Sequence, residues 1–194
     1  MIWLLIIPIA FAFARLFTRK YVFSALTTLA CAAIAAPHAP ILAAGLVISA
    51  VGDYFMSHRG NRDDVYVLAI ACFFIGHALF IADAVRRVTT IAVPLVLGAA
   101  LLVGYSIYLF VRLMPKLSKA MKIAVSCYML ISAAGITCAM MTADPVYIAS
   151  IALLLFSDTM IAESDFVENK KARLLILPPY YLCHILMALS AMLR

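Results

Sequence analysis

Charged residues are scarce in this sequence. Lys, Arg, Asp and Glu make up 12% of its 194 residues, and 67% of the residues are hydrophobic. An ordinary soluble domain has about 25% charged and about 45–50% apolar residues. A soluble surface needs more charge than this chain carries, so the composition excludes a soluble globular domain. Lipid must surround most of the chain, and we expect an integral membrane protein.

Glycine, proline and cysteine are also too few for other classes of protein. The sequence has 7 Gly, 8 Pro and 5 Cys, and it contains no C-x-x-C pair. These counts exclude collagen-like, disordered and disulfide-rich chains. All the cysteines fall in apolar segments, where we interpret them as small packing residues. The fold class that remains is an all-α membrane protein.

Eight apolar segments result when the chain is divided at charged residues, prolines and polar clusters. A helix crosses a hydrocarbon core of about 30 Å with about 20 residues, or about 17 where its flanks compensate. The predicted spans are residues 1–14, 21–36, 41–56, 65–85, 91–110, 123–142, 147–163 and 174–193. Ala10, Ala12 and Ala14 resemble a signal-peptidase site, but no Lys or Arg stands before them, so we expect the first segment to be retained. We therefore predict a single domain, residues 1–194, of eight transmembrane helices.

Lys and Arg are distributed unevenly over the predicted loops. Twelve of them lie in loops one, three, five and seven, and three lie on the other side. The twelve are Arg15, Arg19, Lys20, Arg59, Arg62, Arg112, Lys116, Lys119, Lys122, Lys170, Lys171 and Arg173, and the three are Arg86, Arg87 and Arg194. Short loops rich in Lys and Arg stay cytoplasmic. We predict cytoplasmic odd loops, both termini outside and a location in a bacterial inner membrane. The net charge of +6 then comes from the Lys and Arg that orient the chain in the membrane, and no nucleic-acid partner is expected.

Four ionisable residues lie inside the predicted spans, namely Asp53, His77, Asp158 and His184. A charge in hydrocarbon costs at least about 2.5–3.5 kcal/mol on insertion scales, so such residues are candidates for function. The rise of an α-helix places all four within about 6 Å of one another in depth. They are predicted to form one polar pocket, slightly to the cytoplasmic side of the membrane midplane.

The two aspartates belong to a short repeated pattern. A small residue precedes each aspartate, and a histidine follows on the next segment, His77 after Asp53 and His184 after Asp158. The third and seventh segments run in the same direction. The pattern predicts a parallel four-plus-four internal repeat with the pocket between its halves.

Further polar residues near the aspartates are candidate supporting or substrate-binding groups. Tyr180 and Tyr181 are one helical step apart, so we expect only one of them to face the pocket. Either can hydrogen-bond a carboxylate or an ether oxygen, or anchor the helix at the interface. Ser49 and Ser157 can also hydrogen-bond in the site. Ser49 equally fits a close-packing helix face together with neighbouring glycines.

Several of these segments resemble the YhhN family of eight-span proteins. The likeness lies in Gly52-Asp53, in Phe-Ile-Gly-His-Ala-Leu-Phe-Ile at 74–81, in Phe156-Ser157-Asp158-Thr159 and in Tyr180-Tyr181. The best-known animal members of the family are lysoplasmalogenases. The resemblance implies hydrolysis of the vinyl-ether bond of a lysoplasmalogen, a lysophospholipid, to a fatty aldehyde and glycerophospho-ethanolamine or glycerophospho-choline. One departure is His184, which stands where the family pattern Tyr-Tyr-x-x-Gln has Gln.

The two aspartates suit this reaction. A vinyl ether is cleaved when its β-carbon is protonated and water attacks the resulting oxocarbenium ion. A low-dielectric site favours the protonated form of a carboxylic acid, which can supply that proton. A second, ionised carboxylate can stabilise the cation and take a proton from water. Asp53 and Asp158 can fill these two roles in either order, and we expect no cofactor.

Two other kinds of function stay open. Two Asp and two His also form a possible ligand set for a metal-assisted lipid hydrolase, although no H-x-x-x-H pair occurs. A small transporter or lipid-binding protein can use the same carboxylates for proton or cation coupling. A serine hydrolase is disfavoured because no G-x-S-x-G elbow occurs.

Cations flank the predicted cytoplasmic mouth of the pocket and are candidates for holding a lipid phosphate. They are Arg59, Arg62, Lys170, Lys171 and Arg173. The positive-inside bias also accounts for them.

Overall fold

A computed structural model describes residues 2–58, 60 and 62–194. In these residues the regular structure is helical and no strand occurs. The elements are η1 (Ile2–Leu5), α1 (Ile6–Thr18), α2 (Val22–Ala35), α3 (Pro40–His58), α4 (Asp63–Val85), α5 (Ala92–Tyr108), η2 (Leu109–Leu113), η3 (Met114–Lys116), α6 (Lys119–Met141), α7 (Pro145–Phe166), α8 (Lys170–Leu174) and α9 (Leu177–Met192). The all-α prediction is therefore confirmed for the described part of the chain.

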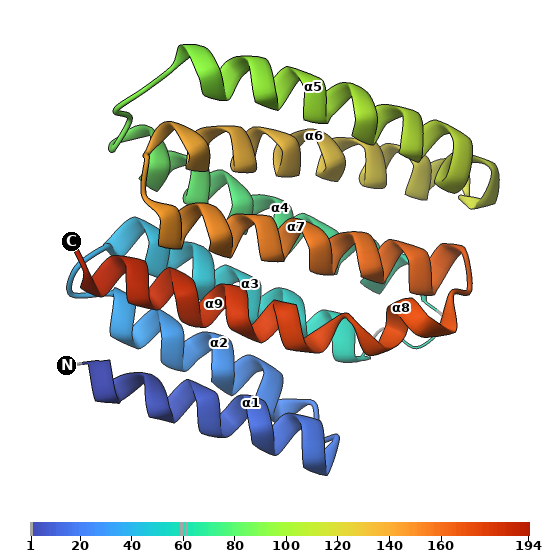
Figure 1. The fold of residues 1–194 in the computed structure, drawn as a ribbon. Helices are drawn as coiled ribbons and strands as arrows, with labels where there is room; N and C mark the ends of the chain where they lie inside the picture. Colours follow the sequence, from blue (N-terminus) through green and yellow to red (C-terminus); the bar gives the residue numbers. More distant parts are fainter. Residues whose placement is uncertain (1, 59, 61) are drawn as a thin grey trace.

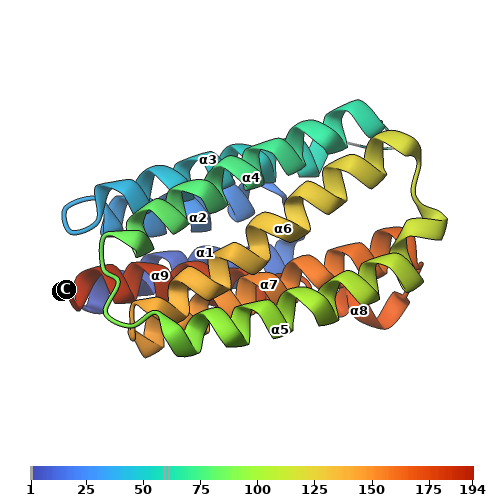
Figure 2. The ribbon, with the colours of Figure 1, turned by 90° about the horizontal axis from the view of Figure 1, so that it is seen from above.

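Six helices form a closed ring. Each packs on the next in the order α2, α3, α4, α6, α7, α9, and α9 packs back against α2. Helix α1 lies outside the ring against α2, and α5 lies outside against α6 (Figure 1). Figure 2 shows that α6 runs obliquely to its neighbours α4 and α5. The ring encloses an interior that no single pair of helices could shield from lipid.

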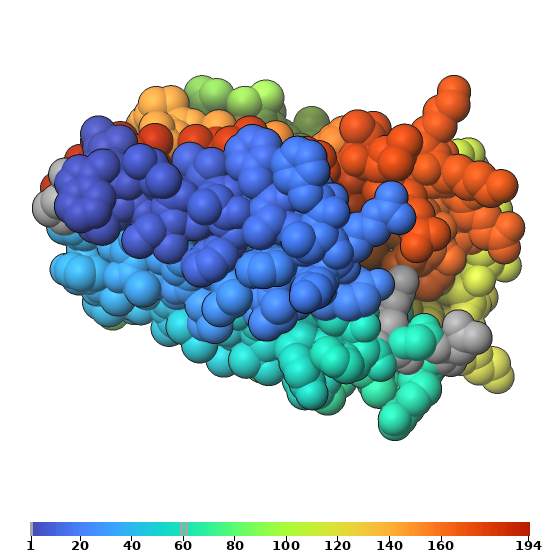
Figure 3. Space-filling model, turned by 90° about the horizontal axis from the view of Figure 1, so that it is seen from below, coloured from blue at the N-terminus to red at the C-terminus, as the bar shows by residue number. Residues whose placement is uncertain are grey.

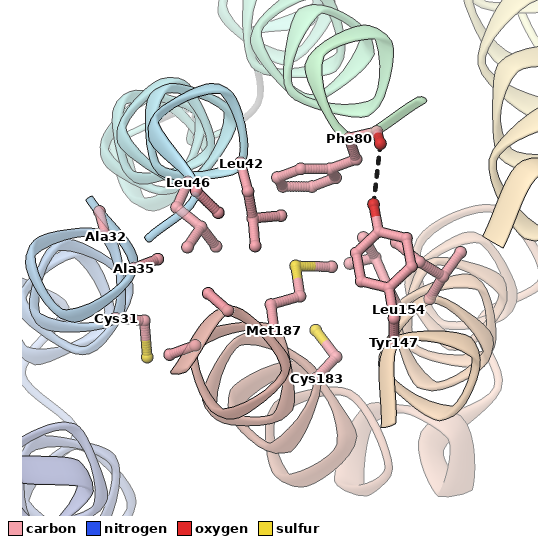
Figure 4. Packing of buried hydrophobic residues seen from close by; sticks show 14 of the residues in the cluster. Cys31, Ala32, Ala35, Leu42, Leu46, Phe80, Tyr147, Leu154, Cys183 and Met187 are labelled. Atoms are coloured by element: carbon pink, nitrogen blue, oxygen red, sulfur yellow. Dashed lines mark hydrogen bonds between the residues drawn. The ribbon is translucent and has the colours of Figure 1, made fainter. Parts of the chain in front are cut away.

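An apolar core fills the half of the ring nearest the chain termini. Leu42 and Leu46 of α3, Phe80 of α4 and Met187 of α9 are at most 1% exposed and meet there (Figure 4). The hydroxyl of Tyr147 on α7 donates to the carbonyl of Phe80 across 2.8 Å. These contacts tie α3, α4, α7 and α9 together and leave the other half of the ring for polar groups.

Helices α3 and α4 approach each other through small residues. A Cβ atom on Gly45 would lie 2.5 Å from Cε1 of Phe80, and one on Gly76 would lie 2.7 Å from Oγ of Ser49. The Ser49 hydroxyl donates to the carbonyl of Gly45 at 3.0 Å. Ser49 therefore belongs to a close-packing face, and among the described residues its hydroxyl binds the backbone of its own helix and not an aspartate.

In the described part of the chain, five helices are long and apolar enough to cross a membrane by length and composition. They cover Pro40–His58, Asp63–Val85, Ala92–Lys116, Lys119–Met141 and Pro145–Phe166, whereas Ile2–Thr18, Val22–Ala35 and Leu177–Met192 are shorter. Large apolar side chains such as Val96 and Val111 are at least 70% exposed on the outside of the bundle, as expected where lipid is the solvent. The structure thus supports a multi-pass membrane protein, and the number of eight spans stays a prediction.

Several helices extend beyond the predicted apolar segments. Helix α4 begins at Asp63 instead of residue 65, and α6 begins at Lys119 instead of residue 123. A helix can continue through charged residues. The apolar run marks only the part of the helix that lies in lipid, so the helix need not end where the run ends. The same effect corrects the prediction for Arg15, which lies inside α1 and not in the first loop.

Both termini lie at the same end of the bundle, and the connections after α1, α3, α5 and α7 lie at the opposite end (Figure 1). This alternation agrees with the predicted path of the chain, while the sides of the membrane stay a prediction. Around the ring, α2, α3 and α4 stand opposite α6, α7 and α9. A four-plus-four repeat predicts this order, and the repeat itself also stays a prediction.

Candidate functional site

Asp53 and Asp158 line the same cavity, which has a volume of about 120 Å³. We call it the aspartate cavity. Asp53 is 7% exposed and the Asp158 side chain is 12% exposed. The lining also includes Arg15, Tyr21 and Leu177, which lie near the odd-loop ends of their helices. In Figure 3 the surface is hollowed between the blue N-terminal helices and the orange segment that carries α8.

Both carboxylate oxygens of Asp53 accept a hydroxyl hydrogen bond. The Tyr180 hydroxyl on α9 donates to Oδ1 at 2.7 Å, and the Thr28 hydroxyl on α2 donates to Oδ2 at 3.0 Å. Nδ1 of His184 lies 3.4 Å from Oγ1 of Thr28. The His184 ring is fully buried beside the Tyr180 ring, and its Nε2 has no hydrogen-bond partner among the described residues. His184 therefore lies behind the two donors of Asp53, next to Thr28 and to the Tyr180 ring.

Asp158 has a similar but looser set of partners. The Tyr128 hydroxyl on α6 donates to its Oδ2 at 2.8 Å, and Nε2 of His77 on α4 lies 3.9 Å from the same oxygen. Nδ1 of His77 lies 3.0 Å from the carbonyl oxygen of Phe73. Because a carbonyl only accepts, Nδ1 carries the proton and Nε2 turns a lone pair toward Asp158. The distance of 3.9 Å is longer than a direct hydrogen bond.

Every helix of the ring contributes to this site. Asp53 on α3 takes partners from α2 and α9, whereas Asp158 on α7 takes partners from α6 and α4. His77 follows Asp53 in the sequence pattern but lies beside Asp158. The structure thus brings together Asp53, Asp158, His77, His184 and Tyr180. Asp158 in the second half of the chain lies beside His77 of the first half, and Asp53 in the first half binds Tyr180 of the second.

Two other candidate residues contact neither aspartate, and for Tyr181 this agrees with the expectation that only one tyrosine of the pair faces the pocket. The Tyr181 hydroxyl donates to Oγ of Ser24 at 3.3 Å, so only Tyr180 of the tyrosine pair contacts a carboxylate. The Ser157 hydroxyl donates to the carbonyl of Ile176 at 3.0 Å, at the break between α8 and α9. Ile176 lines the aspartate cavity, but the Ser157 hydroxyl binds its backbone carbonyl and not a carboxylate, because a helix break leaves backbone carbonyls that need donors.

Three residues of the site were not predicted. Thr28 and Tyr128 hydrogen-bond the aspartates. In the sequence, each is a polar residue well inside an apolar segment, and this feature could have indicated them. Arg15 lines the aspartate cavity, is 9% exposed and holds its Cζ 4.6 Å from the centre of the Tyr21 ring. In the sequence, the apolar residues Leu16 and Phe17 follow Arg15 directly and could have indicated its position inside the helix. That pair shows that the apolar run continues past the arginine.

The cations predicted to flank the mouth lie away from the cavity lining. Arg62 is exposed and pairs with Asp64 at 2.6 Å. Lys170, Lys171 and Arg173 are exposed, and none of these four cations lines the aspartate cavity. Arg59 lies outside the described residues. Among the described residues, Arg15 is thus the cation that faces the carboxylates across the cavity.

A second, smaller cavity adjoins the first. It has a volume of about 60 Å³ and is lined mainly by apolar side chains of α3, α4, α6 and α7. It shares Met56, Phe73, Asp158 and Ile161 with the aspartate cavity. We call it the side cavity. The side cavity thus gives Asp158 an apolar surface on the side away from Asp53 and Arg15.

No group of three or more His, Cys, Asp or Glu side chains in the described part of the chain is placed to hold a metal ion. The two histidines approach the site from different sides, one beside Asp158 and the other behind Thr28. The metal-assisted alternative therefore finds no ligand set among these residues.

A ring of apolar helices around two buried carboxylates defines a class of protein, a multi-pass membrane protein with an acid pair in its interior. The chain matches the model of the YhhN family over residues 9–191 and belongs to this family. The match runs from α1 to α9 and so covers every residue of the site. No curated protein and no solved structure matches the chain.

Proposed function

We propose that this protein is a membrane-embedded lysoplasmalogenase. It hydrolyses the vinyl-ether bond of a lysoplasmalogen to a fatty aldehyde and glycerophospho-ethanolamine or glycerophospho-choline. Membership of the YhhN family supports a hydrolase. The observation that carries the proposal is that Asp53 and Asp158 face one cavity, because vinyl-ether hydrolysis needs an acid and a base on the same substrate.

In the proposed mechanism, one carboxylic acid protonates the β-carbon of the vinyl ether, and the double bond becomes an oxocarbenium ion. The other carboxylate stabilises this cation and takes a proton from the attacking water. The resulting hemiacetal then breaks into the aldehyde and the free glycerol hydroxyl. This division of labour needs no covalent intermediate on the protein.

We assign the base role to Asp53 and the acid role to Asp158. Both oxygens of Asp53 accept hydroxyl hydrogen bonds, which favour the ionised carboxylate. Asp158 has one such donor, from Tyr128, and the lone pair of His77 faces it. His77 is then a positioning residue, because its neutral ring adds no second donor to Asp158.

The same proposal includes eight spans with both termini outside. The 14 residues of α2 rise about 21 Å, less than a full hydrocarbon core. Helix α2 nevertheless closes the ring between α3 and α9, so it must share their depth in the membrane. An alkaline phosphatase fused after Arg194 should be active outside the membrane, and one fused after Lys119 should be inactive.

Purified protein in detergent tests the activity. We expect aldehyde release from a 1-alkenyl lysophospholipid and no fatty-acid release from the matching 1-acyl lysophospholipid. Folded protein that releases no aldehyde contradicts the proposal, and release of fatty acid alone indicates an esterase. Proton-coupled uptake into vesicles without hydrolysis would indicate the transport alternative.

A further inference from the structure

Arg15 is a buried cation that forms no ion pair in the described part of the chain. Its residue is 9% exposed, and its Nε has no hydrogen-bond partner among the described residues. No ion pair joins its guanidinium to a carboxylate in the described part of the chain. Buried charges in proteins are normally paired, because an unpaired one is costly to desolvate. The arginine is therefore arranged for an anion that comes from outside the chain.

The guanidinium is held in place and still faces open space. Its Cζ lies 4.6 Å from the centre of the Tyr21 ring, a distance at which a cation is attracted to the ring face. Both residues line the aspartate cavity. Stacking on one face of the guanidinium leaves its N–H donors, which lie in the plane, available to a ligand.

The carboxylate of Asp53 does not fill this role. Its two oxygens accept from Tyr180 and Thr28, and although its charge interacts with that of Arg15, no ion pair joins the two side chains in the described part of the chain. A guanidinium matches the oxygens of a phosphate group in a bidentate arrangement, which a single ammonium cannot do. The chemistry on this side of the cavity therefore fits a phosphate ester.

We propose that Arg15 binds the phosphate group of a lysophospholipid whose ether bond lies between Asp53 and Asp158. This assignment rests on the proposed function and deepens it by naming the group that orients the substrate. Arg15 lies three residues before the end of α1, and Asp53 lies five residues before the end of α3. The phosphate then lies toward the odd-loop end, and the hydrocarbon chain extends past Asp158 into the side cavity.

Binding to the full-length protein in detergent tests this assignment without any hydrolysis. The probes are a saturated 1-alkyl lysophospholipid, which has no vinyl ether to cleave, the matching 1-alkylglycerol, which lacks phosphate, and inorganic phosphate alone. We expect Arg15→Gln to weaken binding of the lysophospholipid roughly tenfold to a hundredfold, as the loss of a charged hydrogen bond does. Binding of the alkylglycerol should stay the same.

Arg19→Gln is the matched control, because Arg19 is exposed four residues further along the chain. It should bind both lipids as the natural protein does. Should Arg15→Gln fail to fold, Arg15→Lys serves in its place. Lysine keeps the charge but loses the bidentate geometry, so the preference for the phosphate-bearing lipid should fall several-fold.

Each outcome bears on Arg15 separately from the activity. Equal binding of the lysophospholipid by the natural protein and by a folded Arg15 variant overturns the assignment, even if the enzyme cleaves vinyl ethers. Selective, Arg15-dependent binding by a protein that releases no aldehyde supports the assignment and counts against the lysoplasmalogenase proposal. Inorganic phosphate that binds as tightly as the lysophospholipid overturns the lipid assignment in favour of a free phosphate site.

Discussion

Tyr180 lies 127 positions after Asp53 in the sequence, yet its hydroxyl donates to Oδ1 of this aspartate across 2.7 Å. The tyrosine is 5% exposed and the aspartate 7% exposed, so the hydrogen bond is shielded from solvent. A hydrogen bond to a carboxylate in such surroundings is stronger than one between neutral groups. This contact joins α3 to α9 and fixes one of the two carboxylates of the site.

Asp53→Asn and Asp158→Asn should each lower the rate of aldehyde release by at least about a hundredfold, because neither amide can act as acid or base. Asn has the same shape as Asp, so thermal unfolding should show a folded protein in both cases. Asp64→Asn is the control, because the Asp64 side chain is 67% exposed and pairs with the exposed Arg62, away from the aspartate cavity. Full activity in a folded Asp53→Asn or Asp158→Asn variant would contradict the assigned roles.

Tyr180→Phe and Tyr128→Phe each remove one hydroxyl donor from a carboxylate. The loss of a hydrogen bond to a charged group corresponds to about 1.5–3 kcal/mol, so kcat should fall about tenfold to a hundredfold. Tyr181→Phe removes only the 3.3 Å hydrogen bond to Ser24 and should have a smaller effect. Steady-state kinetics on the three variants compares them. An equal loss in all three would show that the hydroxyls act through general packing.

The carboxylate of Asp144 should make the stability of the fold depend on pH. It lies just outside the α7 span as its N-cap, where it accepts from the backbone N–H groups of Val146 and Tyr147 at 3.0 Å, from Ser190 and from Arg87. Burial alone would raise the pKa of Asp144. The hydrogen bonds and the nearby guanidinium outweigh burial, so its pKa lies below the usual value.

Because the pKa of folded Asp144 is depressed, its charge stabilises the fold fully above about pH 4, the value of a free Asp side chain. This contribution is lost as the pH falls through the folded pKa. Asp144→Asn keeps an N-cap but not the charge. Its Tm should therefore lie below that of the natural protein near pH 7, and the two should converge below pH 4. A constant difference in Tm from pH 3 to pH 7 would contradict this role of the charge.

Gly45→Ala tests the close approach of α3 and α4. The added methyl would meet the Phe80 ring, which is 1% exposed, and the backbone carbonyl of Gly76 at 3.1 Å. Overpacking of this kind destabilises a protein by about 1–3 kcal/mol. Gly104→Ala on α5 is the control, because nothing lies within 4 Å of its added methyl. Thermal unfolding should show a lower Tm for Gly45→Ala and an unchanged or higher Tm for Gly104→Ala.

The sequence was enough to predict the helical class and the convergence of four ionisable residues. Charge is so rare in the apolar segments that each buried Asp or His stands out, and helix rise alone gives its depth. Depth does not give direction around a helix, however. For that reason Ser157 was expected in the site although its hydroxyl reaches Ile176.

Partners on other helices could not be predicted in the same way. Thr28 and Tyr128 are common residues in membrane helices, and only the closed ring places them beside the aspartates. Arg15 was assigned to a loop because the count of apolar residues stopped at the first charge. The helix continues to Thr18, since its backbone hydrogen bonds do not depend on side-chain polarity.

The closed ring also has a consequence for the order of synthesis. Helix α9 follows all the other ring helices in the chain, and it carries both Tyr180 and the surface that packs against α2. Until α9 is made and packs into the ring, Asp53 lacks its second hydroxyl donor, and no helix separates α2 from α7. Both acids precede α9 in the chain, but the cavity that they share is enclosed only when this last helix of the ring packs against α2 and α7.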